Sequence, residues 1–357
     1  MARLAYLGTS NGIYCYSIDP TIGDLLPLSN PECDTGVLTG VASHPSGKFL
    51  YATDSTASAV RAYQIDPASG ALTQLPGPEA TVELNPGSVT VHPTGQFLYV
   101  GNYSSDSVSA FSINAATGAL TPVQGSPFAT GHLPNAIVID PSGQYLYTPN
   151  NGANNVSGFA INPTTGALTP APHSPFSTGV IFSPQDPYPT FAAALTIDPA
   201  GKFVFVANSG SPQISAFTLD RSTGELTPVA GSPFSDSNCP PPTINSPPGA
   251  CSAGGVSVDA SGKYLYVFDA VNTVAGFAID NSTGALILLP GSPFAASPYP
   301  LVATATGPYL YVSNNGAAGS VSTFTVDTAT GALTQNTGSP VAASPPGGGA
   351  YSLTLVP

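Results

Sequence analysis

A tetrad close to Thr-Gly-Ala-Leu occurs seven times in this chain, and its regular spacing constrains the fold more than any other feature of the sequence. The interval between copies is 47 or 48 residues, apart from two longer intervals of 58 and 60 residues. A second pattern, in which His or Asp precedes Pro, a small residue and Gly, recurs between the tetrads, most clearly at positions 44–47, 92–95, 140–143 and 198–201. Equal internal periods of this length indicate a chain built from stacked or radially arranged repeats.

Each repeat contains four short segments rich in Val, Ile, Phe and Tyr, and residues typical of turns separate these segments. In one copy the segments fall near 136–140, 144–150, 155–162 and 167–176. Four strands in a unit of this size are typical of a propeller blade. The sequence therefore predicts an all-β fold, a single seven-bladed β-propeller over residues 1–357, with four antiparallel strands, A to D, running outward in each blade.

The two ends of the chain complete one repeat between them. Val356 and Pro357 stand where His44 and Pro45 stand in a full copy, and the first three residues replace those that follow. We therefore expect the C-terminal segment to supply the innermost strand of the blade whose other three strands begin the chain. Pairing the ends in this way closes the ring and leaves no unpaired sheet edge.

The charge balance excludes several classes of partner. The chain carries six Lys and Arg against 19 Asp and Glu, for a net charge of −13. Without a basic stripe it is not suited to bind nucleic acid or an anionic membrane surface. No apolar run approaches the roughly 18 residues of a spanning helix. Four Cys and few Lys favour an extracytoplasmic or secreted origin. The first residues already read as a strand, so we expect the leader to be absent from this chain. A cytoplasmic origin stays open.

The predicted topology sorts the charged residues between two faces. We call the face with the A–B and C–D turns the turn face, and the face with the B–C loops and D-to-A links the funnel face. The turn face receives five of the six basic residues: Arg3, Lys48, Lys202, Arg221 and Lys263. The funnel face receives Arg61 and nine acidic residues: Glu32, Asp34, Asp54, Glu79, Glu83, Asp106, Asp186, Asp236 and Asp269. We expect a negative potential there, which repels anions; the alternative is that these are scattered, solvated acids.

The funnel face also collects many Asn side chains. Asn is favoured in such loops because it tolerates left-handed backbone angles, which explains most of them. The remainder could hydrogen-bond a neutral polar ligand near the central funnel. The candidate ligand-binding residues are Asn135, Asn150, Asn151, Asn208, Asn314, Tyr103, Asp54 and Asp269.

Two insertions fall on the same face, at about 177–190 and 235–255. Long irregular loops in a compact domain are often functional. Cys239 and Cys251 bracket a Pro-rich part of the second insertion, and we predict a disulfide between them that would hold the loop. Cys15 replaces a small residue of a C strand and is expected to be a buried thiol. A bridge from Cys15 to Cys33 is the less favoured alternative.

Few residues offer chemistry. No set of His, Cys, Asp and Glu has metal-ligand spacing and no Gly-rich loop opens a helix, so neither a metal nor another cofactor is predicted. Of the four His, only His132 lies in a D-to-A link from which it could reach the funnel. The candidate catalytic set is therefore His132 with Asp106 or Asp186.

The segments "LYVGNYSSDSVSAFSINAATGALTPV" and "LYVSNNGAAGSVSTFTVDTATGALT" resemble the YVTN-type, lactonase-like seven-bladed propellers, a group that includes 6-phosphogluconolactonase and carboxymuconate-lactonizing propellers. The resemblance covers essentially the whole chain and implies a funnel with a catalytic His, an Arg and a Glu. These positions fall on Asn135, Ala193 and Ser209 here. Neutral residues of these types supply neither a general base nor a guanidinium for a carboxylate or phosphate.

These departures favour an extracytoplasmic, non-catalytic binding or structural scaffold acting through the Asn- and Asp-rich face. Its partner would be a neutral or cationic small molecule, a carbohydrate or a protein, and close packing of copies into an array is a further hypothesis. The alternative is a lactonase-like hydrolase with a rearranged active site in the funnel. The balance of the residues inclines away from an enzyme.

Overall fold

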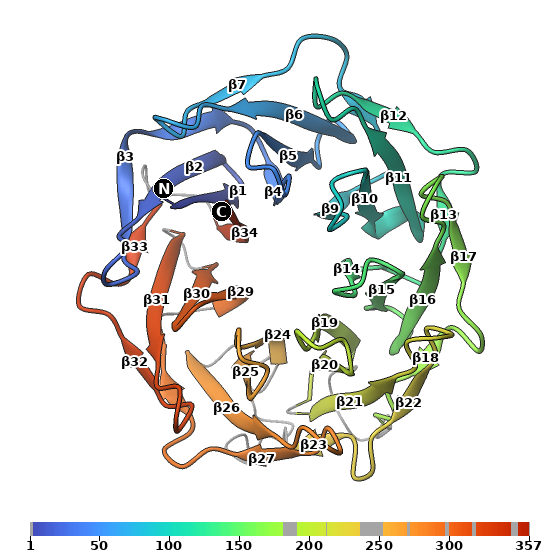
Figure 1. Cartoon of the computed structure of the whole chain (residues 1–357), viewed down its shortest axis with the longest axis vertical. Helices are drawn as coiled ribbons and strands as arrows, with labels where there is room; N and C mark the ends of the chain where they lie inside the picture. Colours follow the sequence, from blue (N-terminus) through green and yellow to red (C-terminus); the bar gives the residue numbers. More distant parts are fainter. Residues whose placement is uncertain are drawn as a thin grey trace.

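Seven antiparallel sheets stand in a ring around a central axis (Figure 1). The computed structural model describes residues 3–180, 191–211, 213–235, 253–269, 272–296, 300–315, 319–343 and 349–356. In these residues the predicted all-β, seven-bladed propeller is confirmed. Blade 1 consists of β34, β1, β2 and β3, and blades 2 to 7 begin at β4, β9, β14, β19, β24 and β29.

The strands of each blade follow one another outward from the axis, as expected. The innermost strands are β34 (Ala350–Val356), β4 (Leu38–Ser43), β9 (Pro86–Val91), β14 (Val138–Ile139), β19 (Phe191–Ile197), β24 (Ala253–Val258) and β29 (Pro300–Thr306). The second strands are β1 (Arg3–Thr9), β5 (Phe49–Asp54), β10 (Phe97–Asn102), β15 (Tyr145–Asn150), β20 (Phe203–Ser209), β25 (Tyr264–Asp269) and β30 (Tyr309–Asn314). The third strands are β2 (Gly12–Ile18), β6 (Ala59–Ile65), β11 (Ser107–Ile113), β16 (Asn155–Ile161), β21 (Gln213–Leu219), β26 (Thr273–Ile279) and β31 (Ser320–Val326).

The outermost strand differs from the prediction, because it is split in two in blades 2 to 7. Its first part is β7 (Leu72–Gln74), β12 (Leu120–Pro122), β17 (Leu168–Pro170), β22 (Leu226–Pro228), β27 (Leu286–Leu288) or β32 (Leu333–Gln335). Its second part pairs with the same third strand further along: β8 (Ala80–Thr81), β13 (Phe128–Ala129), β18 (Phe176–Ser177), β23 (Phe234–Ser235), β28 (Phe294–Ala295) or β33 (Val341–Ala342). A bend that contains Pro in each of these blades, and also Gly in all of them except blade 4, separates the two parts and interrupts the ladder. Blade 1 has one long outer strand, β3 (Leu25–Thr35).

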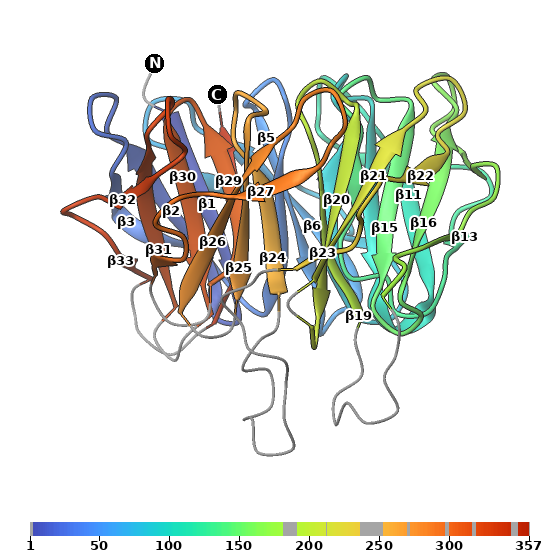
Figure 2. The same cartoon turned by 90° about the horizontal axis from the view of Figure 1, so that it is seen from below.

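The two ends of the chain meet as predicted. Strand β34 pairs antiparallel with β1, with Val356 opposite Leu4. Strand β34 also bonds to blade 2, because the Ser352 hydroxyl accepts a hydrogen bond from the Val41 N–H at 2.9 Å. Both ends of the chain lie on the upper edge of the ring in Figure 2. This edge is the turn face, and the opposite edge is the funnel face.

A tyrosine in the second strand of six blades explains why the Thr-Gly turn recurs. The Tyr51 hydroxyl donates to the carbonyl oxygen of Gly118 in the next blade at 3.0 Å, and Tyr99 donates to Gly166 at 2.9 Å. Tyr311 of blade 7 donates to Gly23 of blade 1 at 2.7 Å, which closes the circle. Burial raises the pKa of the Tyr51 and Tyr99 hydroxyls, so they stay protonated donors. The sequence period is thus also the period of contacts between blades.

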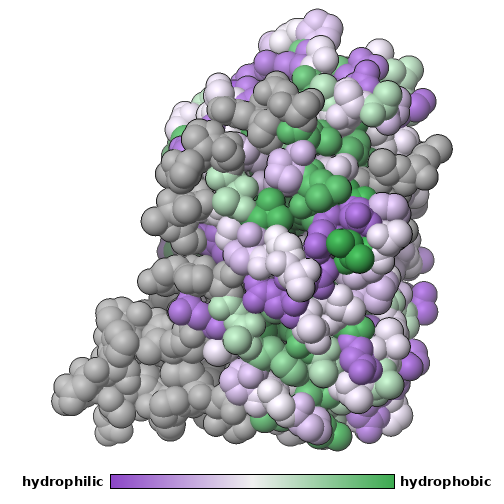
Figure 3. Space-filling model, turned by 90° about the vertical axis from the view of Figure 1, so that its left-hand side faces the viewer, coloured by the Kyte–Doolittle hydropathy of each residue, from purple (hydrophilic) through white to green (hydrophobic). Residues whose placement is uncertain are grey.

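The turn glycine itself is required by its backbone and its neighbours. Gly118 has φ of +74°, in the left-handed region, and a Cβ atom there would lie 2.6 Å from Cδ1 of Phe49 in the preceding blade. Apolar clusters fill the spaces between neighbouring blades, for example where Phe97 and Tyr99 of blade 3 meet Leu146 of blade 4. On the outer wall around β3 and β32, hydrophobic and hydrophilic residues are interleaved (Figure 3).

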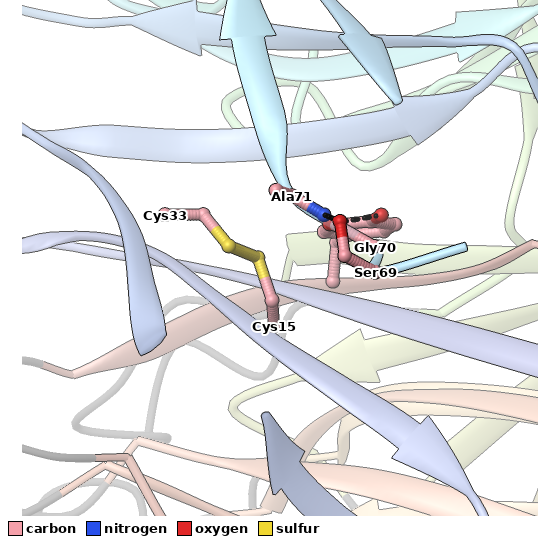
Figure 4. Close-up of a disulfide and its surroundings, with 6 residues drawn as sticks. Cys15, Cys33, Ser69, Gly70 and Ala71 are labelled. Atoms are coloured by element: carbon pink, nitrogen blue, oxygen red, sulfur yellow. Dashed lines mark hydrogen bonds between the residues drawn. A yellow bond between two sulfur atoms is a disulfide. The ribbon is translucent and has the colours of Figure 1, made fainter. Parts of the chain in front are cut away.

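The expectation of a free thiol at Cys15 is wrong. Cys15 and Cys33 form a disulfide that joins β2 to β3 (Figure 4). The two strands are antiparallel neighbours, and the Cα atoms are 6.2 Å apart, within the range that a disulfide spans. The sequence placed Cys33 in a link to the next blade, because it did not show that β3 continues as far as Thr35. The pairing with Cys15 was therefore not favoured. Cys239 and Cys251 lie outside the described residues.

Candidate functional site

The structure brings His132 and Asp106 together on the funnel face. Asp106 follows the short 3-10 helix η1 (Tyr103–Ser105) in the B–C loop of blade 3, where its φ of 52° turns the chain into β11. His132 lies in the link from blade 3 to blade 4. Its Nδ1 atom is 3.1 Å from both carboxylate oxygens of Asp106. The third member of the candidate set, Asp186, lies outside the described residues.

The Asp106 carboxylate is fixed by a second contact. The backbone N–H of Leu133 donates to Asp106 Oδ1 at 2.8 Å, and this bond and the neighbouring His132 lower the pKa of Asp106. Asp106 is therefore ionised at neutral pH, and its carboxylate accepts a hydrogen bond from the Nδ1–H group of His132. The Nε2 atom of the imidazole then carries the lone pair. The His132 side chain is 59% exposed, so solvent reaches the imidazole.

Gly152 sets the position of the imidazole from the other side. It lies in the B–C loop of blade 4, and its N–H donates to the His132 carbonyl oxygen at 3.0 Å. A Cβ atom at Gly152 would overlap Cδ2 of the His132 ring. The ring is thus held between two B–C loops. Sequence reasoning missed Gly152 and Leu133, because an Asn-Gly pair in a loop indicates only a turn.

The positions that the resemblance assigns to the family's catalytic His and Arg also meet. Asn135 stands just before β14, and its Nδ2 atom donates to the carbonyl oxygen of Ala193 in β19 at 2.7 Å. Ser209 lies at the end of β20, opposite Phe191 of the same inner strand. The three positions therefore gather at the inner ends of blades 4 and 5, as the resemblance implies. Their side chains are neutral, and Asn135 is exposed beside them.

Three of the proposed ligand-binding amides are instead internal parts of the blades. Asn150, Asn208 and Asn314 are almost completely buried at the ends of their strands. Each side-chain N–H₂ group bonds to the neighbouring third strand; Asn314, for example, donates to the hydroxyl of Ser322 at 3.0 Å. Their oxygen and nitrogen atoms lie too deep to contact a ligand on the surface. Asn151 and Tyr103 remain partly exposed on the funnel face, and nothing is described of the Asp269 side chain.

Asp54, the remaining predicted ligand residue, is part of a charged cluster around Arg61. Nη2 of Arg61 lies 2.6 Å from the Asp54 carboxylate, Nη1 lies 3.5 Å from Asp34, and Nε lies 3.4 Å from Glu79. Burial opposes ionisation of Asp54, but hydrogen bonds from Thr56 and Ala57 and the charge of Arg61 leave its pKa lowered. The one basic side chain placed on this face is therefore already surrounded by three carboxylates.

Other elements of the described residues add no further chemistry. No three His, Cys, Asp or Glu side chains gather there in a way that could hold a metal ion. Within the same ranges, no helix is long and apolar enough to cross a membrane.

The ring has seven blades and a His–carboxylate pair on its funnel face, and comparison with known proteins shows its family. The family model described as "Lactonase, 7-bladed beta-propeller" matches residues 4–105, 75–184 and 234–346, which together are most of the chain. The chain belongs to this family of propeller lactonases. No curated protein matches the sequence.

Solved structures with the same fold extend over the full length. A proposed 6-phosphogluconolactonase from Bacteroides fragilis has a TM-score of 0.80 and 23% identity, covering 100% of this chain and 98% of its own. Its counterpart from Bacteroides uniformis has a TM-score of 0.80 and 20% identity, with 99% of both chains covered. The periplasmic gluconolactonase of Pseudomonas aeruginosa has a TM-score of 0.77 and 21% identity, covering 100% of this chain and 99% of its own.

These findings correct the functional expectation. A non-catalytic binding or structural scaffold is contradicted by membership of a lactonase family, and three solved propellers of the same fold are named as lactonases. The inclination away from an enzyme is likewise unsupported. The family favours the alternative, a lactonase-like hydrolase.

Proposed function

We propose that this propeller hydrolyses an uncharged lactone on its funnel face, with His132 as the general base. The observation that carries the proposal is the His132–Asp106 pair, because a carboxylate that accepts a hydrogen bond from Nδ1–H leaves Nε2 as the imidazole nitrogen that can act as a base. Neutral imidazole is the side chain best suited to take a proton from water near pH 7.

The chemistry requires one proton relay. Nε2 of His132 takes a proton from a water molecule, whose oxygen attacks the carbonyl carbon of the lactone. The ring C–O bond then breaks, and the leaving alkoxide takes the proton back from Nε2. Asp106 stays ionised throughout and stabilises the imidazolium that forms in between. The product is a hydroxy acid, and its new carboxylate is repelled by the acidic face.

The charges favour a substrate without a phosphate group. Four of the chain's six basic residues lie in turns on the opposite face, and Arg3 begins β1 at the same edge. Arg61, on the funnel face, is surrounded by Asp34, Asp54 and Glu79. A phosphorylated lactone would meet carboxylates without a free cation, whereas a neutral sugar lactone would not be repelled.

A comparison of two His variants tests this proposal. Hydrolysis of glucono-δ-lactone and 6-phosphoglucono-δ-lactone is followed by acid release in a pH-stat. We expect kcat/KM to be higher for the neutral lactone, and His132→Ala to lower it by about 10²- to 10⁴-fold.

His173→Ala is the matched control, because His173 also pairs with a carboxylate, that of Glu225 at 2.8 Å, on an exposed part of blade 4. It should leave the rate unchanged. Equal rates in wild type and His132→Ala would exclude His132 as the base. No turnover of any lactone in a wider panel would contradict the activity itself.

A further inference from the structure

In five blades a serine in the bend of the outer strand accepts a hydrogen bond from the third strand. In blade 4 the backbone N–H of Gly158 donates to the hydroxyl of Ser174 at 2.9 Å, and the ring of Phe176 covers Gly158 so closely that a Cβ atom there would lie 2.8 Å from it. The same hydrogen bond from the third strand to a serine hydroxyl occurs in blades 3, 5, 6 and 7, with Ser126, Ser232, Ser292 and Ser339.

Blade 2 keeps the backbone register but lacks the serine and the phenylalanine of this contact. Val60 pairs with Ala80 as Val156 pairs with Phe176 in blade 4. Pro78 stands where blade 4 has Ser174, and Ala80 replaces the phenylalanine. The surface beneath is left partly exposed at Ala62, whereas the equivalent Ala110 and Ala216 are 0% exposed.

The missing side chains leave a large cavity between blades 2 and 3. Its volume is 1180 Å³, and its apolar walls include Val60, Ala62, Ala80, Phe111 and Leu120. Its lining includes Gln74 of β7 and Leu120 of β12, two outer strands at the rim of the ring (Figure 1), and does not include His132. A concave, mostly apolar cavity of this size is large enough for a small organic molecule.

Two points of the cavity, at Ala62 and at Lys48, define what such a molecule should carry. The Ala62 carbonyl oxygen accepts from Leu75, so the Ala62 N–H points to the same side, into the cavity, where proline at position 78 offers no hydroxyl. Lys48 lines the cavity near Ile65, three residues along the strand and about 10 Å away. Among the described residues no carboxylate lies within salt-bridge distance of Lys48, whereas Glu79 is engaged by Arg61 and Gln74.

We propose that this cavity binds an aromatic carboxylate. The aromatic ring lies over Ala62, in the place that phenylalanine fills in blade 4, and the carboxylate pairs with the Lys48 ammonium. A short chain between ring and carboxylate bridges the distance between the two points. The cavity is therefore a second ligand site, separate from the lactone site, and it prefers a carboxylate where the lactone site prefers an uncharged substrate.

Calorimetric titration of the full chain with 3-phenylpropionate tests the site, with 3-phenylpropan-1-ol as the uncharged analogue. We expect the acid to bind more tightly than the alcohol. Ala80→Phe restores the internal ring and should weaken binding of both compounds by about tenfold or more. Unchanged binding in Ala80→Phe, or no binding of the acid to the wild type, would overturn the proposal.

A second pair of variants keeps the test independent of how Ala80→Phe folds. Lys48→Gln should remove the preference for acid over alcohol. Lys202→Gln is the matched control, because Lys202 has the same place in the turn of blade 5, where Leu219 donates to its carbonyl oxygen and Ser232 is present. Lys202→Gln should keep the preference; its loss there, or its survival in Lys48→Gln, would contradict the assigned pairing.

Discussion

On the turn face, blades 2 and 3 are joined by the same bonds that join blades 3 and 4, whereas the charged contacts on the funnel face differ between blades 2 and 3. His44 Nε2 donates to the Gly95 carbonyl oxygen at 3.0 Å, and His92 donates in the same way to Gly143 at 2.8 Å. On the funnel face, Asp54 at the end of β5 in blade 2 contacts Arg61. Asp106, which follows β10 in blade 3, contacts His132 instead.

This difference separates what builds the ring from what gives it chemistry. Contacts that repeat with the sequence period hold neighbouring blades together, and substituting any one of them should affect stability. Contacts that occur once, such as the one between Asp106 and His132, contribute little to holding the blades because both side chains are about half exposed. Substituting those should affect activity and leave stability nearly unchanged.

The largest effect is expected from a repeated position of the ring. Gly118→Ala places a side chain at φ of +74° and within 2.6 Å of the Phe49 ring. The left-handed backbone and the overpacking together should lower the free energy of unfolding by about 2–4 kcal/mol. Urea unfolding measures this loss.

Gly87→Ala is its control, since a Cβ atom at Gly87 meets nothing within 4 Å and its φ is not in the left-handed region. It should shift the midpoint little. Equal midpoints for the Gly118→Ala and wild-type proteins would show that the turn glycine is not needed for blade packing.

The next effect concerns the funnel face and should lower the rate of lactone hydrolysis without changing the stability of the fold. Gly152→Ala forces the His132 ring away from its present place, because the new methyl group would overlap Cδ2. A displacement of the base by about 1 Å can lower the rate by up to about 100-fold. We therefore expect kcat for the neutral lactone to fall by about 10- to 100-fold, with the urea midpoint close to that of the wild type. An unchanged kcat would mean that His132 does not act from this position.

The same division explains how much could be predicted from the sequence. The fold, the closure by β34 and the sorting of charges between faces follow from the period alone, because the repeated contacts have sequence signals. The sequence offered two partners for His132, Asp106 and Asp186, and it did not decide between them. Burial of Asn150, Asn208 and Asn314 was missed, since an amide that binds a serine hydroxyl inside a blade looks the same in sequence as one in a loop.

Two features of the outer wall were also missed because they are departures from the repeat. The disulfide between Cys15 and Cys33 depends on how far β3 continues, which pattern reasoning does not give. The cavity of blade 2 depends on the loss of a serine and a phenylalanine whose partners lie in the third strand. The sequence shows both absences at residues 78–80, but only the structure shows that nothing else fills the space.

The smallest effect tests whether the tyrosine contacts are equivalent around the ring. Six blades have a tyrosine that donates to a turn carbonyl, while blade 5 has Phe205 at this position. Tyr99→Phe should lower the free energy of unfolding by about 1 kcal/mol, the usual net value of such a hydrogen bond. Phe205→Tyr should raise it by up to about the same amount if its hydroxyl reaches Gly284 as Tyr147 reaches Gly224. Opposite signs in urea unfolding would show that the blades use one contact geometry. A loss in both variants would mean that blade 5 is packed differently at this point, and that the turn face is less regular than its sequence.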